Sequence, residues 1–107
     1  MKTGDVAKII IEFLNMPAVA EYFTNREGRT VLNEQDVVDN KGALHRIDRL
    51  VVNTESVTVL DYKTGDEKET YDEQVREYMD IARTVYPAKT VKGFLLYVDR
   101  KSVREVI

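Results

Sequence analysis

The sequence predicts an α/β fold in which helices cover a central mixed sheet. Apolar residues recur at three- and four-residue spacing near the start of the chain and again in its last third, which is typical of amphipathic helices. Alternating or continuous apolar runs between and after these segments indicate strands. The resulting order is α, β, β, β, α, β. A helix that joins two strands in this way crosses one face of the sheet.

Two helices are predicted before the first strand. Residues 5–14 repeat apolar side chains at helical spacing, and Pro17 suits the first turn of a short second helix that reaches Phe23. Gly28 then ends the helical pattern. Helices of this kind bury one stripe of side chains, so we expect them to pack on the sheet.

Three strands separated by turns are predicted next. Residues 29–39 and 43–52 flank the turn sequence DNKG, and the turn sequence NTES precedes a third strand at residues 57–63. Short turns between consecutive strands favour antiparallel pairing of neighbours.

A helix and two strands complete the chain. Thr70 and Glu73 match a capping-box pattern at the start of a helix that ends near Tyr86, just before a proline. Residues 91–98 are almost continuously apolar, as expected for a strand inside a sheet, and residues 102–107 add a short edge strand.

Composition and charge exclude several classes of protein. The chain has 107 residues, of which 43% are apolar and 33% charged, a balance typical of one small globular domain rather than a disordered segment. It has no cysteine, which excludes disulfides and thiolate metal sites and suits a cytoplasmic setting. A net charge of −3 does not favour a free-standing nucleic-acid binder. The sequence shows neither a membrane-spanning stretch nor a secretion signal.

Ionised side chains lie inside the third predicted strand, in the sequence VLDYKTG. Side chains two apart share a face of a strand, so Asp61 and Lys63 project together, with Val57 and Val59 behind them. Asp48, in the preceding strand, comes close to Asp61 if the connecting hairpin has ordinary register. Two carboxylates beside each other repel unless a divalent cation neutralises them, and oxygen ligands favour Mg²⁺ or Mn²⁺.

Such a site suits hydrolysis of a phosphodiester bond. An ion held by Asp48 and Asp61 can bind a phosphate oxygen and lower the pKa of a water molecule. Lys63 can orient that water or stabilise the charge that develops on the phosphate, and the Tyr62 backbone carbonyl offers a further oxygen ligand. The alternatives from these residues alone are a surface ion pair between Asp61 and Lys63 and a solvated strand face around Asp48.

These residues and motifs carry a resemblance to the PD-(D/E)XK nuclease superfamily. An aspartate at position 48 is followed thirteen residues later by Asp61-Tyr62-Lys63, and Gln74-x-x-x-Tyr78 lies on the next helix. The sequences IDRL, VLDYKTG, YDEQVREYMDIA and GFLLYVD match the pattern of this superfamily. Within it, residues 4–107 are most similar to the RecB/AddA-type C-terminal nuclease domain of UvrD-like helicases.

The resemblance implies a restriction-endonuclease-like αβββαβ core and a Mg²⁺- or Mn²⁺-dependent deoxyribonuclease of the exonuclease type. Its catalytic residues would be Asp48, Asp61, Lys63 and Gln74. The two aspartates and the Tyr62 carbonyl would hold the metal. The implied partners are DNA, the helicase motor domains of the same parent polypeptide and a second helicase-nuclease subunit, in DNA repair and recombination and without a membrane.

Three further residues bear on this resemblance. Tyr78 borders the site and helps to place DNA or the lysine, although it also fits the buried stripe of its helix. Glu34 corresponds to an acidic residue on the first strand and lies near the metal ligands or is only structural. The similar domains usually carry a histidine ligand on an upstream helix. His45, the only histidine here, is expected to be exposed, on the face of its strand opposite to Asp48.

The missing upstream histidine leaves two hypotheses open. We expect residues 1–107 to be a single nuclease-like domain cut from a larger helicase-nuclease, without the upstream helix. The alternative is a catalytically inert module of the same fold that has a structural or DNA-guiding role.

Overall fold

The computed structural model describes residue 8 and residues 11–107, so most of the helix expected at residues 5–14 lies outside the described part. Residues 11–14 are helical, and Phe13 is buried. None of the described helices is long and apolar enough to cross a membrane. The elements that follow are α2 (Pro17–Ala20), η1 (Glu21–Phe23), β1 (Thr30–Val38), β2 (Leu44–Val52), β3 (Ser56–Lys63), α3 (Glu69–Val85), β4 (Thr90–Tyr97), η2 (Val98–Arg100) and β5 (Ser102–Val106).

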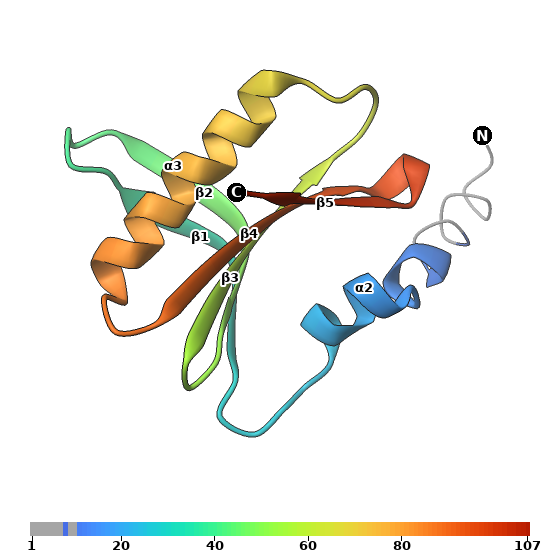
Figure 1. The fold of residues 1–107 in the computed structure, drawn as a ribbon, viewed down its shortest axis with the longest axis horizontal. Helices are drawn as coiled ribbons and strands as arrows, with labels where there is room; N and C mark the ends of the chain where they lie inside the picture. The colour runs from blue at the N-terminus through green and yellow to red at the C-terminus, as the bar shows by residue number, and fades with distance from the viewer. Residues whose placement is uncertain (1–7, 9–10) are drawn as a thin grey trace.

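The strands form one mixed sheet in the order β1-β2-β3-β4-β5, as Figure 1 shows. β3 and β4 pair in parallel, and the other neighbouring strands are antiparallel. Parallel neighbours need a crossover connection, which α3 supplies. The sequence-based prediction of an α/β fold with a mixed sheet is therefore confirmed, as are the second short helix and all five strands to within a few residues.

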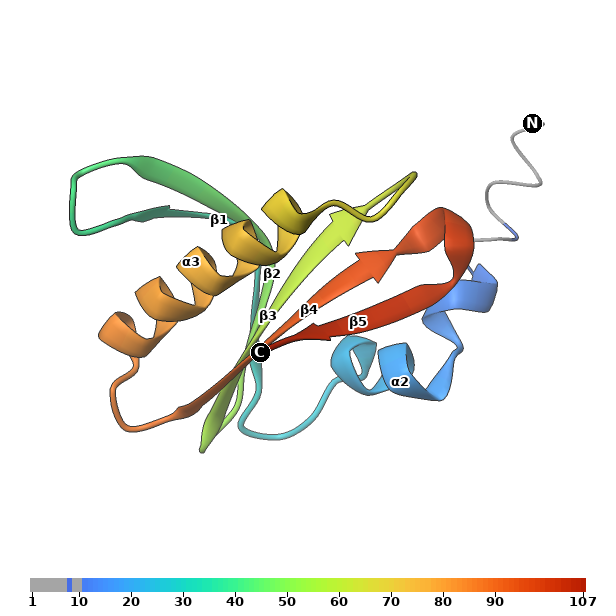
Figure 2. The same ribbon diagram turned by 45° about the horizontal axis from the view of Figure 1, so that its top comes forward.

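α3 and the helical segment before β1 lie on opposite faces of the sheet (Figure 2). Val57 and Val59 of β3 lie in the core cluster under α3. Leu60 lies in a second cluster, together with Phe13 and Val19 from the helical segment before β1. The strand therefore alternates as its sequence predicts, and its α3 face leads directly to Asp61.

α3 approaches β4 closely because Gly93 has no side chain. A Cβ atom at this position would lie 2.5 Å from Sδ of Met79 and 2.7 Å from Cγ1 of Val75, both of which belong to α3. Ordinary contacts between carbon atoms are about 3.5–4.0 Å. The glycine thus fixes how deeply the helix sits on the sheet.

The predicted capping box at the start of α3 is wrong. The helix begins at Glu69, Lys68 is the N-cap residue, and no side chain caps the first turn. Thr70 already lies inside the helix, so its hydroxyl cannot take the N-cap role. The acidic side chains of Glu69 and Asp72 lie in the first turn instead, where the positive end of the helix dipole favours them.

β1 and β2 change their alternation halfway along. In β2, Ile47 and Leu50 both lie in the cluster under α3, although residues three apart on a regular strand face opposite ways. The ladder between the two strands skips one pair, Glu34 with Asp48, and Glu34 has a φ of 50°. A residue with positive φ breaks the regular pleat, so the side chains on the two sides of this point do not follow one alternation.

Candidate active site

The structure brings Asp48 and Asp61 together at the end of the β2–β3 ladder. This ladder ends with the pair Arg49–Leu60, and Asp48 and Asp61 are the next residues along the two strands. Oδ2 of Asp48 accepts a hydrogen bond of 2.9 Å from the backbone N–H of Tyr62. The hairpin register assumed in the sequence analysis is therefore the register found, and the two acidic side chains are neighbours.

Burial makes Asp61 an unusual carboxylic acid. Its side chain is 5% exposed. Desolvation and a hydrogen bond with Asp48 raise the pKa of Asp61 to about 6, against an opposing effect of the Lys63 ammonium. A charged group that is buried beside another acid is disfavoured unless a cation compensates it.

Lys63 joins the acidic pair to α3. Its Nζ lies 3.0 Å from Oδ2 of Asp61 and donates a hydrogen bond of 2.9 Å to Oε1 of Gln74. The same ammonium lies 4.5 Å from the centre of the Tyr71 ring, within reach of a cation–π interaction. Three contacts from two elements thus hold the lysine amine beside the carboxylates.

Tyr62 presents its side chain and its backbone to different places. The ring is stacked against Phe23 at a centroid distance of 6.4 Å, on the face away from α3. In an extended strand the N–H and C=O of one residue point to the same side. Because the N–H of Tyr62 bonds Asp48, its carbonyl points to the same edge, just beyond the end of the ladder.

Tyr78 and Glu34 lie beside the acidic pair in different ways. Tyr78 is a core residue, 4% exposed, and its pKa is raised first by burial and then by the charges of Asp61 and Asp48. Its burial agrees with the packing role that the helical stripe predicts. Glu34 is exposed and stands opposite Asp48 in the register of β1 and β2.

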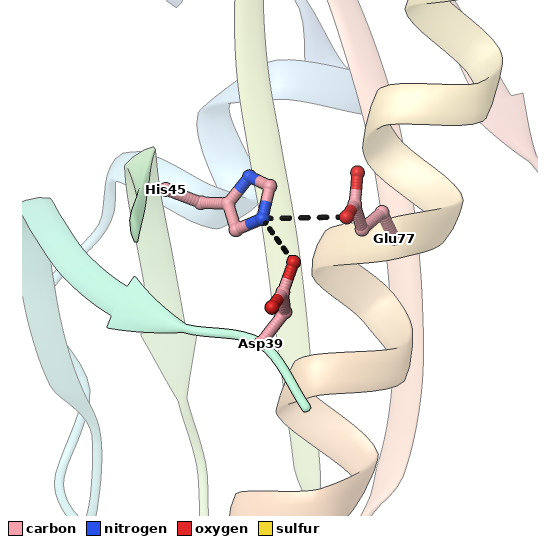
Figure 3. A group of neighbouring side chains, drawn as sticks. All are labelled: Asp39, His45 and Glu77. Atoms are coloured by element: carbon pink, nitrogen blue, oxygen red, sulfur yellow. Dashed lines mark hydrogen bonds and ion pairs between the residues drawn. The ribbon is translucent and has the colours of Figure 1, made fainter. Parts of the chain in front are cut away.

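The expectation for His45 is wrong. The side chain is 19% exposed, and its ring meets the Tyr78 ring edge-on at 5.9 Å, so it lies on the α3 side of the sheet (Figure 3). Its Nε2 contacts Asp39 and Glu77. The physical reason is the break in alternation at Asp48, which a count of residues along the strand cannot reveal. The sequence gives no sign of this second group of side chains.

The acidic pair fits a divalent cation. Oδ2 of Asp61 is buried and forms an ion pair with the Lys63 ammonium at 3.0 Å, without a well-aligned hydrogen bond from the described residues. One ammonium does not balance two neighbouring carboxylates, and a buried excess of negative charge is costly. Asp48 and the Tyr62 carbonyl add further oxygens at the same edge, and an all-oxygen set suits a hard cation such as Mg²⁺ or Mn²⁺.

Comparison with known proteins gives the family. No curated protein matches the chain. The family model of the PD-(D/E)XK nuclease superfamily matches residues 9–106, which is nearly the whole sequence. The mixed five-stranded sheet with its crossover helix is consistent with the restriction-endonuclease-like fold of that superfamily. The chain belongs to the PD-(D/E)XK nuclease superfamily.

Proposed function

We propose that this chain is the metal-dependent deoxyribonuclease domain, of the exonuclease type, of a helicase-nuclease that acts in DNA repair and recombination. Membership of the nuclease superfamily supports the hydrolytic reaction. The observation that carries the proposal is the buried Asp61, which lies beside a second aspartate and forms an ion pair of 3.0 Å with a lysine amine.

Asp48, Asp61 and the Tyr62 carbonyl would hold the metal. A bound Mg²⁺ or Mn²⁺ ion supplies Lewis-acid activation of a phosphate oxygen and of a water molecule. The backbone N–H of Tyr62 orients the Asp48 carboxylate through its Oδ2 atom. Burial keeps bulk water from screening the charge of Asp61, which strengthens its hold on a cation.

Lys63 acts on the reacting phosphate. Its ammonium is fixed next to Asp61 and is within reach of any group bound there. A positioned cation stabilises the negative charge that grows on the phosphoryl oxygens in the transition state. Gln74 accepts a hydrogen bond from the amine and so limits its rotation, which makes Gln74 a positioning residue.

DNA binding requires partners that compensate the acidity of this chain. The net charge is −3, and phosphate contacts with Lys and Arg supply most of the affinity of nucleic-acid binders. We propose that helicase motor domains of the same polypeptide, and a second helicase-nuclease subunit, hold the strand and deliver its end to the site.

The test is cleavage of end-labelled DNA by the chain and by its parent polypeptide with Mg²⁺ or Mn²⁺. Asp61→Ala and Lys63→Ala are each expected to lower the rate at least about 100-fold, since each removes preorganised charge from the site. Asp66→Ala, at a carboxylate that is 88% exposed, is the matched control and keeps activity. Undiminished cleavage by both site variants contradicts the proposal. Absence of both Mn²⁺ binding and cleavage in the wild-type parent favours an inert module.

A further inference from the structure

A second group of ligand-type side chains lies away from the acidic pair, where the tip of the β1–β2 hairpin meets α3 (Figure 3). Asp39 follows β1, His45 is in β2 and Glu77 is on α3. Nε2 of His45 lies 2.8 Å from Oδ2 of Asp39 and 3.3 Å from Oε1 of Glu77. One atom from each residue lies within 4.8 Å of the other two. Three elements thus converge on one point.

The turn holds Asp39 in place. Its Oδ1 accepts hydrogen bonds from the backbone N–H groups of Lys41, at 2.8 Å, and Ala43, at 2.9 Å. Oδ2 is therefore directed to His45. The hydrogen bond with His45, followed by those from Ala43 and Lys41, lowers the pKa of Asp39 to about 2, so the carboxylate is ionised at neutral pH. Metal-binding carboxylates in proteins are held by outer hydrogen bonds in this way.

The spacing of these atoms suits coordination of one ion. Zinc binds imidazole nitrogen and carboxylate oxygen at about 2.0–2.2 Å, which places neighbouring ligand atoms about 2.8–3.6 Å apart in octahedral or tetrahedral arrangements. The observed separations of 2.8 and 3.3 Å from Nε2 of His45 to the two carboxylate oxygens lie within this range. One imidazole nitrogen with two carboxylates favours a borderline transition metal over Mg²⁺, which prefers oxygen alone.

A proton on Nε2 of His45 satisfies the two carboxylates less fully than a metal ion does. The nitrogen Nε2 carries at most one N–H, and this N–H points toward one acceptor at a time. Two carboxylate oxygens nevertheless face it. A divalent ion can bind both carboxylate oxygens at once. Because Glu77 is 47% exposed, water can reach a further coordination position of the ion.

We propose that Asp39, His45 and Glu77 form a second divalent-metal site, for a transition metal of the zinc type, which ties the β1–β2 hairpin to α3. The site uses none of the residues of the acidic pair and does not depend on the nuclease activity. Two ligands come from the β1–β2 hairpin, which backbone hydrogen bonds hold together, and the third comes from α3, so binding of the ion restrains the helix against the hairpin. An ion that binds the folded state and not the unfolded state stabilises the fold by mass action.

The composition of the chain makes the test specific. It contains one histidine and no cysteine, so His45 is the only imidazole and no thiolate competes for zinc. Zn²⁺ is titrated by calorimetry into the whole chain, free of a histidine tag and in excess Mg²⁺, which occupies oxygen-only sites. We expect one Zn²⁺ per chain, a rise in Tm, and a change in the nitrogen chemical shift of the single imidazole in NMR spectra.

Matched variants separate this site from the acidic pair. His45→Gln and Glu77→Gln are expected to weaken Zn²⁺ binding at least tenfold, whereas Asp61→Asn leaves it unchanged. Glu77→Gln keeps the shape of a half-exposed side chain, and circular dichroism checks that it is folded. The proposal is overturned if the wild-type chain binds no Zn²⁺, if its imidazole signal does not respond, or if affinity survives in the His45 and Glu77 variants or falls with Asp61→Asn.

Discussion

The buried carboxylate of Asp61 should make the metal-free protein less stable at neutral pH than its Asp61→Asn variant. Burial and the neighbouring Asp48 disfavour the ionised form, and Lys63 offsets only part of that cost. The substitution replaces the carboxylate with a neutral group of nearly the same shape. The variant therefore keeps the packing of the site and removes its unfavourable charge.

The size and sign of this effect follow from the pKa of Asp61. It rises from 3.8 to about 6 on folding, so between these values the folded state binds more protons than the unfolded state. Stability therefore falls as pH rises through this window, and the loss is complete above it. At about 1.36 kcal/mol for each pKa unit, the raised pKa of Asp61 lowers the stability by about 3 kcal/mol at pH ~8 and by about 1 kcal/mol at pH ~4.5.

The assay is urea unfolding in EDTA at these two pH values. Asp61→Asn is expected to be more stable than the wild-type chain at both, with an advantage about 2 kcal/mol larger at the higher pH. Asp80→Asn, at a side chain that is 76% exposed, is the control for general charge effects and should show little pH dependence. An advantage of equal size at both pH values, or a variant that is less stable at the higher pH, would refute the reasoning.

Two further predictions concern packing. Gly93→Ala should destabilise the fold by about 1–3 kcal/mol, because the new methyl group overlaps the stiff Val75 side chain as well as Met79. Urea unfolding measures this loss of stability, which should be smaller in a Met79→Ala background. Tyr97→Phe should leave stability unchanged or raise it by about 1 kcal/mol, since the buried hydroxyl of Tyr97 has no hydrogen-bond partner within residues 11–107. A loss of stability above about 2 kcal/mol in thermal unfolding would show that this hydroxyl is bonded.

The sequence was sufficient for the elements of the fold and for the acidic pair, because both depend on local rules. Alternation along β3 and the short hairpin to β2 bring Asp48 and Asp61 together without knowledge of distant contacts. His45 was misplaced because its side depends on the positive φ of Glu34 in the neighbouring strand. A conformation of that kind in a non-glycine residue leaves no signal in a hydrophobic pattern. The capping-box pattern misplaces the start of α3, because Thr70-x-x-Glu73 lies inside the first turns of the helix rather than at its N-cap.

Substitutions of Glu34 test whether this residue matters for the backbone conformation of β1 or for metal binding. Its φ of 50° is costly for a residue with a Cβ atom, by about 1–2 kcal/mol. Glycine removes that strain and adds a smaller entropic cost of about 0.5–1 kcal/mol, so Glu34→Gly should be as stable as the wild-type chain or slightly more stable. Glu34→Val, whose branched side chain tolerates this conformation poorly, should lose at least about 1 kcal/mol in urea unfolding.

The same variants separate the two roles when Mn²⁺ affinity is measured beside stability. If Glu34 serves the backbone conformation opposite Asp48 and does not hold the ion, then Glu34→Gly and Glu34→Gln both keep Mn²⁺ binding, because the backbone conformation survives in each. Glu34→Val should lose affinity together with stability, since the strand must change shape to accept it. A Glu34→Gln variant that is fully stable but binds Mn²⁺ at least tenfold more weakly would contradict this reasoning. It would place the carboxylate of Glu34, exposed though it is, among the groups that hold the ion.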